Sequence, residues 1–335
     1  MTTNLFGRCS RLFLAAVVLA LVTTGCGSGS APTPATSTAA GTAPGTASTT
    51  PGTASPGSAG PAVKSTYSKV LLIVEENKSY AEAMGQPGAP YLTSLSRQYG
   101  LATQMQAGYP PGCPSLAAYI LMTSGSTHGI CDDRNPSAHP LTGASIFSQV
   151  AASGREWRSY AEAMPGNCEL TNSGDGLFLV RHVPSTYYLD QRAKCGDWTV
   201  PLGTADSGAL HDDLAAGKLP AFGMITPDAC NDMHGASGCG KQLPTGDAWL
   251  KAWMPKILAA PDYRAGHLAV IVTWDEGTHF DNHIPTMVIS PTTTAISSGT
   301  RWTHCSTLRT TEEILGLPLL GCASTAPSMR QAFHL

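Results

Sequence analysis

The sequence predicts an α/β protein with a mostly parallel central sheet sandwiched by helices. Four aliphatic runs have the length and composition of strands that are buried on both faces; they cover residues 70–74, 221–226, 267–274 and 284–290. Segments with the apolar spacing of helices lie between and after these runs. Alternating strands and helices are typical of a parallel sheet, in which ligands bind beyond the carboxyl ends of the strands.

The expected helices all show apolar residues at helical spacing. They cover residues 90–99, 115–123, 145–152, 247–258 and 307–315. Gly100 and Gly154 come at the ends of the first and third of these segments. Glycine favours helix termination at such positions, because it adopts the left-handed conformation that often ends a helix.

The first 26 residues have the pattern of a signal peptide. Arg8 and Arg11 precede an apolar run that covers residues 12–22. This run is shorter than the roughly 20 residues that span a bilayer, and it fits the apolar core of an export signal. Cys26 follows a small residue, as in a bacterial lipobox, although Thr23 stands where that pattern prefers Leu or Val. We therefore expect a lipoprotein anchored at Cys26 and facing outward, with free secretion as the alternative.

Residues 27–66 are expected to form a disordered tether. Apart from Val63 and Lys64, this segment consists of Gly, Ala, Ser, Thr and Pro. Such a composition cannot bury enough apolar surface to offset the entropy lost on folding. No further low-complexity segment or long apolar run follows, so residues 67–335 are expected to be one domain without a transmembrane span.

Charge and cysteine content narrow the class of this domain. It carries 17 basic and 23 acidic residues, a formal charge of −6, which excludes a nucleic-acid binder that relies on phosphate attraction. Its eight cysteines are an even number in an exported chain, which favours disulfides, and the lack of a C-x-x-C pair argues against structural zinc. We expect pairing between neighbours: 113–131, 168–195, 230–239 and 305–322.

Oxygen-bearing side chains follow two of the predicted strands. Glu75, Glu76 and Asn77 come directly after the first strand, and Asp275 and Glu276 follow the strand at 267–274. Carboxylates that are brought close together repel one another unless a cation lies between them. Each segment alone is compatible with a solvated loop, but together they favour a site for a divalent cation.

A serine and several histidines are candidates for the nucleophile and the proton donor of such a site. Ser115 is the first residue of a predicted helix, where free backbone N–H groups stabilise an anionic phosphoryl group. A metal ion at this position could activate the serine hydroxyl as a nucleophile. The alternative is that Ser115 only caps the helix. The domain contains no G-x-S-x-G segment, which weakens an α/β-hydrolase interpretation. His182, His234 and His283 are candidate proton donors, although a lone histidine is more often structural.

A series of segments resembles the bacterial phosphoesterase family that contains secreted acid phosphatases and phospholipases C. The similarity runs in order through nearly all of the domain. The matching segments are residues 75–80, 114–119, 123–125, 157–165, 181–184, 226–228, 231–234, 246–250, 272–277 and 283–285.

The resemblance implies an alkaline-phosphatase-like fold and hydrolysis of phosphate esters through a phosphoserine intermediate. The matching metal positions are Glu76, Asn77, Ser115, Asp275 and Glu276, with Ser115 as nucleophile and one divalent ion, which could be Ca, Mg, Mn, Zn or Fe. The positions near the transferred phosphate are His182, Asp232, His234 and His283. Of these, His234 or His283 is expected to protonate the leaving group, and His182 and Asp232 to contact substrate.

The chain departs from the family pattern around the nucleophile. Cys113 replaces the usual histidine, and Ala117 and Ala118 replace Pro-Asn. A disulfide at Cys113 would remove one histidine from the phosphate side and alter rate and pH optimum. A phosphomonoesterase that acts on a small phosphate ester is expected, because the domain is short for lipid-binding insertions. The alternatives are a phospholipase C-type phosphodiesterase, which would take phospholipids, and a non-catalytic surface-binding lipoprotein.

Overall fold

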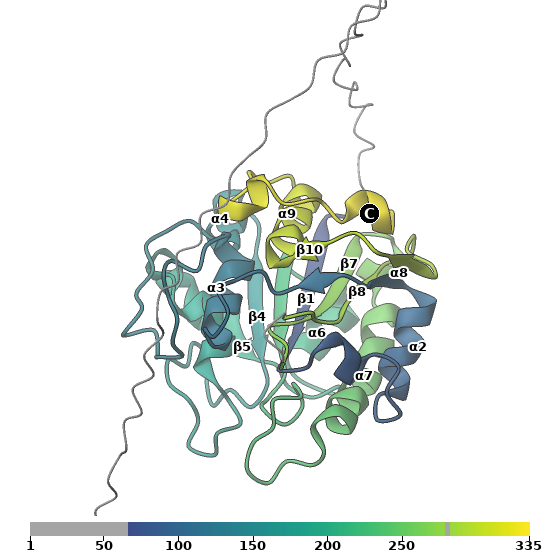
Figure 1. The fold of residues 1–335 in the computed structure, drawn as a ribbon. Coiled ribbons are helices and arrows are strands. Elements are labelled where there is room, and N and C mark those ends of the chain that lie inside the picture. Colours follow the sequence, from purple (N-terminus) through teal and green to yellow (C-terminus); the bar gives the residue numbers. More distant parts are fainter. Residues whose placement is uncertain (1–65, 279–281) are drawn as a thin grey trace, which may run out of the picture. The chain divides into compact units, whose positions relative to one another are not determined.

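A computed structural model describes residues 66–278 and 282–335. The predicted signal peptide, the predicted anchor at Cys26 and almost all of the predicted tether therefore lie outside the described residues. The described part shows an α/β arrangement with the sheet in its centre and helices around it (Figure 1).

Within the described residues, the central sheet has eight strands in the order β5-β4-β6-β1-β7-β8-β2-β9. Their bounds are β1 Lys69–Glu75, β2 Gly100–Ala102, β4 Trp157–Ala161, β5 Thr199–Pro201, β6 Phe222–Thr226, β7 Leu268–Trp274, β8 Thr286–Ile289 and β9 Ile296–Ser298. A smaller sheet pairs β3 (Met105–Gln106) with β10 (Trp302–Thr303). Strands β1 and β7, the predicted buried runs, lie in the middle of the large sheet.

The register of β1 fixes where the polar loops emerge. Strand β1 pairs in parallel with β6 on one side and with β7 on the other. The pairing with β7 ends with Glu75 opposite Trp274, so the next residues, Glu76 and Asp275, leave the sheet side by side. The backbone N–H of Asp275 donates to the Glu75 carbonyl oxygen at 2.9 Å and extends the pairing by one residue.

All four predicted strands are present, and the sheet is mostly parallel as expected. Strand β8 is an exception, because it runs antiparallel to both β7 and β2. Only residues 275–285 separate β7 from β8, whereas a parallel return usually needs a dozen or more residues with a helix. The sequence did not predict β2, β4, β5 and β9, which have three to five residues and no continuous aliphatic run.

The helices form two groups that flank the sheet (Figure 1). One group contains α3 (Ser115–Ser124), α4 (Ile146–Ala152) and α9 (His304–Leu315); the other contains α2 (Pro90–Gln98), α6 (Ala209–Ala216), α7 (Gln242–Ala259) and α8 (Pro261–Arg264). The remaining short helices are α1 Tyr80–Ala83, α5 Arg192–Trp198 and α10 Arg330–Phe333. All five predicted helices are present.

Two of these helices begin earlier than predicted. Helix α7 begins at Gln242, five residues before the expected start, and includes Pro244 in its first turn, where proline is tolerated. Helix α9 begins at His304 because Thr303 and Ser306 cap its first turn. Among the described residues, no helix combines the length and apolar composition needed to cross a bilayer.

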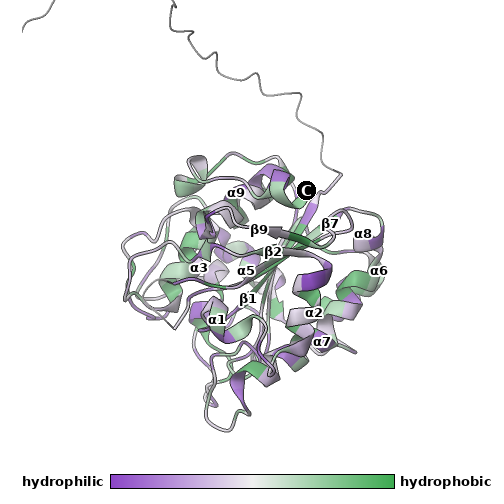
Figure 2. Cartoon of the chain, turned by 45° about the vertical axis from the view of Figure 1, so that its right-hand side comes forward, coloured by the Kyte–Doolittle hydropathy of each residue, from purple (hydrophilic) through white to green (hydrophobic). Residues whose placement is uncertain are grey.

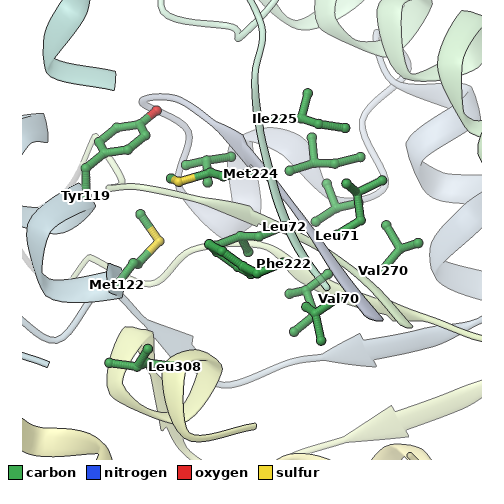
Figure 3. Close-up of a cluster of buried hydrophobic side chains, with 14 of the residues drawn as sticks. Val70, Leu71, Leu72, Tyr119, Met122, Phe222, Met224, Ile225, Val270 and Leu308 are labelled. Atoms are coloured by element: carbon green, nitrogen blue, oxygen red, sulfur yellow. The ribbon is translucent and has the colours of Figure 1, made fainter. Parts of the chain in front are cut away.

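The hydrophobic core holds α3 in place against the sheet. Every residue of α3 is buried, which is typical of a helix enclosed on all sides. Its Met122 lies near Phe222 of the sheet and Leu308 of α9 (Figure 3). Figure 2 shows hydrophobic colour along the central strands, with hydrophilic residues mainly on the surrounding helices and loops. Because interiors of this kind are closely packed, the first residue of α3 has a fixed position relative to β1.

The structure pairs the eight cysteines between neighbours, as expected. The Cα–Cα distances are 4.5 Å for 113–131, 5.2 Å for 168–195, 5.2 Å for 230–239 and 5.5 Å for 305–322. The first bridge ties down the segment just before Ser115. The third ties down the loop that carries Asp232 and His234.

Candidate active site

The loops after β1 and β7 meet at the carboxyl edge of the sheet. Asn77 has a φ of 51°, in the left-handed region that asparagine tolerates better than most residues. This conformation lets its backbone N–H donate to Asp275 Oδ1 at 3.3 Å, while its side-chain Nδ2 donates to Glu76 Oε2 at 2.8 Å. Glu76 and Asp275 are both fully buried. Two carboxylates and one amide from two predicted segments thus lie together.

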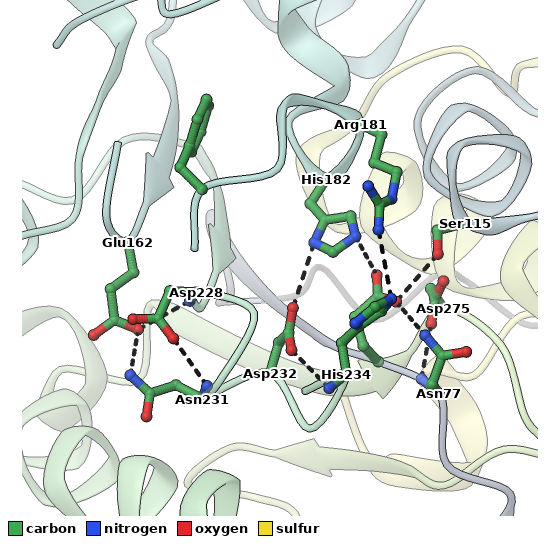
Figure 4. A network of polar contacts seen from close by, with 12 residues as sticks. Asn77, Ser115, Glu162, Arg181, His182, Asp228, Asn231, Asp232, His234 and Asp275 are labelled. Atoms are coloured by element: carbon green, nitrogen blue, oxygen red, sulfur yellow. Dashed lines mark hydrogen bonds and ion pairs between the residues drawn. The ribbon is translucent and has the colours of Figure 1, made fainter. Parts of the chain in front are cut away.

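Helix α3 brings Ser115 and Tyr119 to the same carboxylate. Ser115 Oγ donates to Glu76 Oε2 at 3.1 Å, and the Tyr119 hydroxyl donates to Glu76 Oε1 at 2.8 Å. Residues four apart lie on one face of a helix, so a single helix reaches both oxygens of Glu76. Ser115 also lies close enough to Asp275 to lower the pKa of that carboxyl, against the larger effect of burial, which raises it. The nucleophile candidate is therefore held between the two strand ends (Figure 4).

His182 links two buried carboxylates. Its Nε2 lies 3.1 Å from Glu76 Oε1 and its Nδ1 lies 3.4 Å from Asp232 Oδ2. The ring stacks on Tyr119 with 5.1 Å between centroids, and the residue is only 3 % exposed. Burial is the main cause that lowers the pKa of His182, and the neighbouring cationic groups add to it. A neutral imidazole has one N–H, so it can donate to only one of the two carboxyl groups.

His234 presents one ring nitrogen to the site. Its backbone N–H donates to Asp232 Oδ1 at 2.7 Å, and its Nδ1 lies 2.9 Å from the Gly235 carbonyl oxygen. A carbonyl only accepts, so Nδ1 carries the proton in the neutral ring and Nε2 is the acceptor. This Nε2 lies 3.4 Å from Arg181 Nη2 (Figure 4). His234 is partly exposed, as a residue that exchanges protons with a substrate needs to be.

The structure places His283 differently from His234. Its Nε2 lies 2.9 Å from the Thr103 carbonyl oxygen, and its ring stacks on Tyr80 with 4.7 Å between centroids. Among the contacts of the described residues, none joins His283 to Ser115 or Glu76. Of the two histidines expected to act as the acid, His234 is the one with described contacts to Asp232 and Arg181.

Glu276 borders a pocket beside the nucleophile. The Tyr109 hydroxyl donates a hydrogen bond to Glu276 Oε2. The pocket has a volume of about 300 Å³ and is lined by residues 111–114 on one side and by Glu276, Gly277, Thr278 and Asn282 on the other. Ser115 follows the first of these walls directly. A group attached to a phosphate at Ser115 could occupy this space.

The carboxyl groups of the site have raised pKa values. Burial raises the pKa of Asp275 to about 8, with a further contribution from Glu276. Burial, followed by repulsion from Asp275 and Asp232, raises the pKa of Glu76 well above its usual value. Burial also raises the pKa values of Asp232 and Glu276. The protein chain alone therefore does not compensate the negative charge gathered here.

The donor set fits a hard divalent cation. Asp275 Oδ2 and Asp232 Oδ2 are buried without a hydrogen-bond partner among the described residues. Glu76, Asp275, Asn77 and Ser115 supply carboxylate, amide and hydroxyl oxygens within one connected group, the ligand types that such cations prefer. Within the described residues, no group of three or more His, Cys, Asp and Glu side chains is arranged to hold a metal ion, so a site built here would also have to draw on Asn77 and Ser115.

The pH dependence of stability tests this interpretation of the charges. A carboxyl group whose pKa is higher in the folded than in the unfolded protein binds more protons when folded, so stability falls as pH rises between the two values. For Asp275 this window extends from its ordinary value, 3.8, to about 8. We expect the melting temperature of chelator-treated protein to fall from pH 5 to pH 8. Asp275→Asn should flatten this profile, and a rise in wild-type melting temperature over this range would contradict the account.

Several site residues were not assigned a role from the sequence. Tyr119 could have been found, because it lies one turn after Ser115 on the same helix. Lys78 is close in sequence, but its ammonium donates to the carbonyls of Asn77 and Met233 and to Gln242, not to the carboxylates. His304, fully buried, lies with Nε2 2.7 Å from the Asp275 carbonyl oxygen, and no local pattern indicates this contact.

The described residues have an alkaline-phosphatase-like fold, with a mostly parallel sheet between helices. The fold is similar to that of a solved protein of the alkaline phosphatase superfamily from Vibrio parahaemolyticus, with a TM-score of 0.53, 13 % identity and coverage of 81 % of this chain and 73 % of that one. The model of the Phosphoesterase family matches residues 86–318. The chain belongs to this family, and it is a phosphoric ester hydrolase.

Two characterised relatives carry phosphatase names. The chain is 27 % identical over 266 residues to a phosphatidylinositol-3-phosphatase of Mycobacterium tuberculosis. The aligned region covers 78 % of this chain and 81 % of the relative. The chain is 24 % identical over 267 residues to an acid phosphatase of Aspergillus fumigatus. Here the aligned region covers 76 % of this chain and 56 % of the relative.

Proposed function

We propose that the chain is an exported, metal-dependent phosphomonoesterase that acts through a phosphoserine at Ser115. The observation that carries this proposal is the hydrogen bond that the Ser115 hydroxyl, at the start of α3, donates to the buried carboxylate of Glu76. Ser115 also lies near Asp275 and directly follows the residues that form one wall of the pocket. Export is supported by the four cysteine pairs, since disulfides persist in oxidising compartments. The signal peptide and the lipid anchor at Cys26 complete this proposal.

The residues that would hold the cation are Glu76, Asn77, Ser115 and Asp275, with Glu276 able to join them by leaving Tyr109. When bound, a divalent cation would neutralise these carboxylates and lower the pKa of the serine hydroxyl.

The chemical steps use side chains that the structure brings together. Ser115 Oγ attacks phosphorus in line, its proton passes to Glu76, and the bond from phosphorus to the ester oxygen breaks. The leaving oxygen takes a proton from Nε2 of His234 in its doubly protonated form, while the Nδ1–H stays engaged with the Gly235 carbonyl. A water molecule then attacks the phosphoserine and gives its proton to the neutral His234. The bond from phosphorus to the serine oxygen breaks, inorganic phosphate leaves, and Ser115 regains its proton from Glu76.

The names of the relatives support a monoester substrate. One is named a phosphatidylinositol-3-phosphatase and the other an acid phosphatase. The pocket of about 300 Å³ beside Ser115 is large enough for a small alcohol leaving group or the head of a lipid. We therefore infer that a small phosphate monoester, or a phospholipid with a terminal phosphate, is the substrate.

A substrate panel tests the proposal. The exported protein, purified with its disulfides, is assayed with p-nitrophenyl phosphate, its bis-ester and phosphatidylcholine, first after chelation and then with each of the five metals. We expect hydrolysis of the monoester, its loss after chelation and its return with at least one metal. Faster cleavage of the bis-ester or of phosphatidylcholine would favour the phospholipase C-type alternative. No hydrolysis with any metal would favour a binding protein.

A further inference from the structure

Two side-chain cations lie within the site among the described residues, and they differ in what they can bind. The Lys78 ammonium donates three hydrogen bonds, to Asn77 O, Met233 O and Gln242 Oε1. An ammonium has three N–H groups, so Lys78 has none left for a ligand. Arg181 has five, and its recorded contacts involve only Nε and Nη2. Arg181 therefore retains donors for an anion.

Arg181 also lies next to the residues that would contact a substrate phosphate. Its Nη2 is 3.4 Å from His234 Nε2, the nitrogen that can protonate a leaving group. In Figure 4 its side chain extends beside Ser115 toward His234. His182, the next residue, is less suited to contact substrate, because both its ring nitrogens face buried carboxylates.

Asp133 connects Arg181 to the helix that carries the nucleophile. Asp133 Oδ1 accepts a hydrogen bond from the backbone N–H of Leu116 at 3.0 Å, directly after Ser115. Asp133 Oδ2 lies 3.2 Å from Arg181 Nε. One carboxylate thus fixes the guanidinium relative to the start of α3. The bridge between Cys113 and Cys131 holds this segment against the chain that precedes Ser115.

We propose that Arg181 binds the non-bridging oxygens of the substrate phosphate and that Asp133 is the positioning residue that orients it toward Ser115. This inference rests on the proposed function. A guanidinium offers paired N–H donors that match the oxygens of a phosphate, which a histidine cannot do. Arg181, held by Asp133, would thereby supply the site with a phosphate-binding cation.

Phosphate affinity in matched variants tests this proposal. The inhibition constant of inorganic phosphate and the KM and kcat for p-nitrophenyl phosphate are measured with the metal-loaded enzyme. Arg181→Gln should raise the inhibition constant and KM by about 10- to 100-fold, because hydrogen bonds to a charged group are lost. Asp133→Asn keeps an acceptor for Leu116 but removes the charge that pairs with Arg181. It should raise both constants by about three- to tenfold with little change in melting temperature.

Arg134→Gln is the control. Arg134 is next to Asp133 but pairs with Asp132 on the surface, so its replacement should leave phosphate affinity within about twofold. If Arg181→Gln or Asp133→Asn lowers the melting temperature but leaves the inhibition constant unchanged, the proposed roles are overturned.

Binding of inorganic phosphate to the Ser115→Ala variant, measured by calorimetry, separates this inference from the proposed function. If Ser115→Ala is inactive but binds phosphate equally well with and without Arg181→Gln, only the role of Arg181 is wrong. If wild-type protein hydrolyses no ester but binds phosphate in an Arg181-dependent way, the proposed function is wrong and the anion site stands.

Discussion

Ser115→Ala is expected to lower the kcat for p-nitrophenyl phosphate by on the order of 10⁴-fold or more, because it removes the group that forms the covalent intermediate. The fold should be kept. Glu76 still receives hydrogen bonds from Asn77 and Tyr119, and the apolar residues of α3 remain buried. Steady-state kinetics and thermal unfolding of the purified variant check both expectations.

Ser124→Ala is the matched control for this experiment, since it makes the same change at the other end of the same helix. The Ser124 hydroxyl donates to the carbonyls of Ile120 and Ser126 and has no contact with the carboxylates of the site. This variant should retain wild-type kcat. Activity of Ser115→Ala within tenfold of wild type would rule out serine as the nucleophile.

Glu76→Gln is expected to remove both metal binding and activity. Glu76 is the centre of the site, since Ser115, Tyr119 and Asn77 all donate to it. A neutral amide of the same shape cannot compensate a divalent cation, so we expect metal affinity to fall by at least about 100-fold. Without metal, the variant should melt at the same or a higher temperature than wild type, because a buried charge has been removed. Metal content by mass spectrometry and thermal unfolding test these outcomes.

Glu162→Gln provides the comparison for Glu76→Gln. Glu162 follows strand β4, and its Oε2 accepts hydrogen bonds from the Asp228 backbone N–H and from Asn231 Nδ2. Figure 4 shows it on the far side of Asp232 from Asp275. An amide oxygen can accept the same bonds, so metal content and activity should stay close to wild type. Equal loss of metal in the two variants would show that the candidate ligand set is wrongly placed.

The central part of the fold could be predicted because its signals are local. Continuous aliphatic runs identify β1 and β7, and their parallel pairing brings Glu76 and Asp275 together at one edge. The outer strands lack such runs; β5, for example, is Thr199–Pro201 and depends on pairing with β4. Short strands of this kind are determined by their neighbours, which the sequence does not display.

The site residues also fall into two groups, those that the sequence could indicate and those that it could not. Glu76, Asn77 and Ser115 could be predicted, because each lies at the end of a recognisable element. Asp133 and His304 could not, since they reach the site from loops or helix ends that are distant in sequence and carry no characteristic pattern. The sequence also did not separate His234 from His283, because both follow similar signals. The contacts of His234 with Asp232 and Arg181 come from the structure.

The stereochemical course of phosphoryl transfer tests the covalent mechanism most directly. The substrate is a phosphate ester whose phosphorus is made chiral by oxygen isotopes and one sulfur atom. Two successive in-line displacements, first by Ser115 and then by water, each invert phosphorus, so the account predicts net retention of configuration. Net inversion would mean a single direct attack by water and would contradict a phosphoserine intermediate.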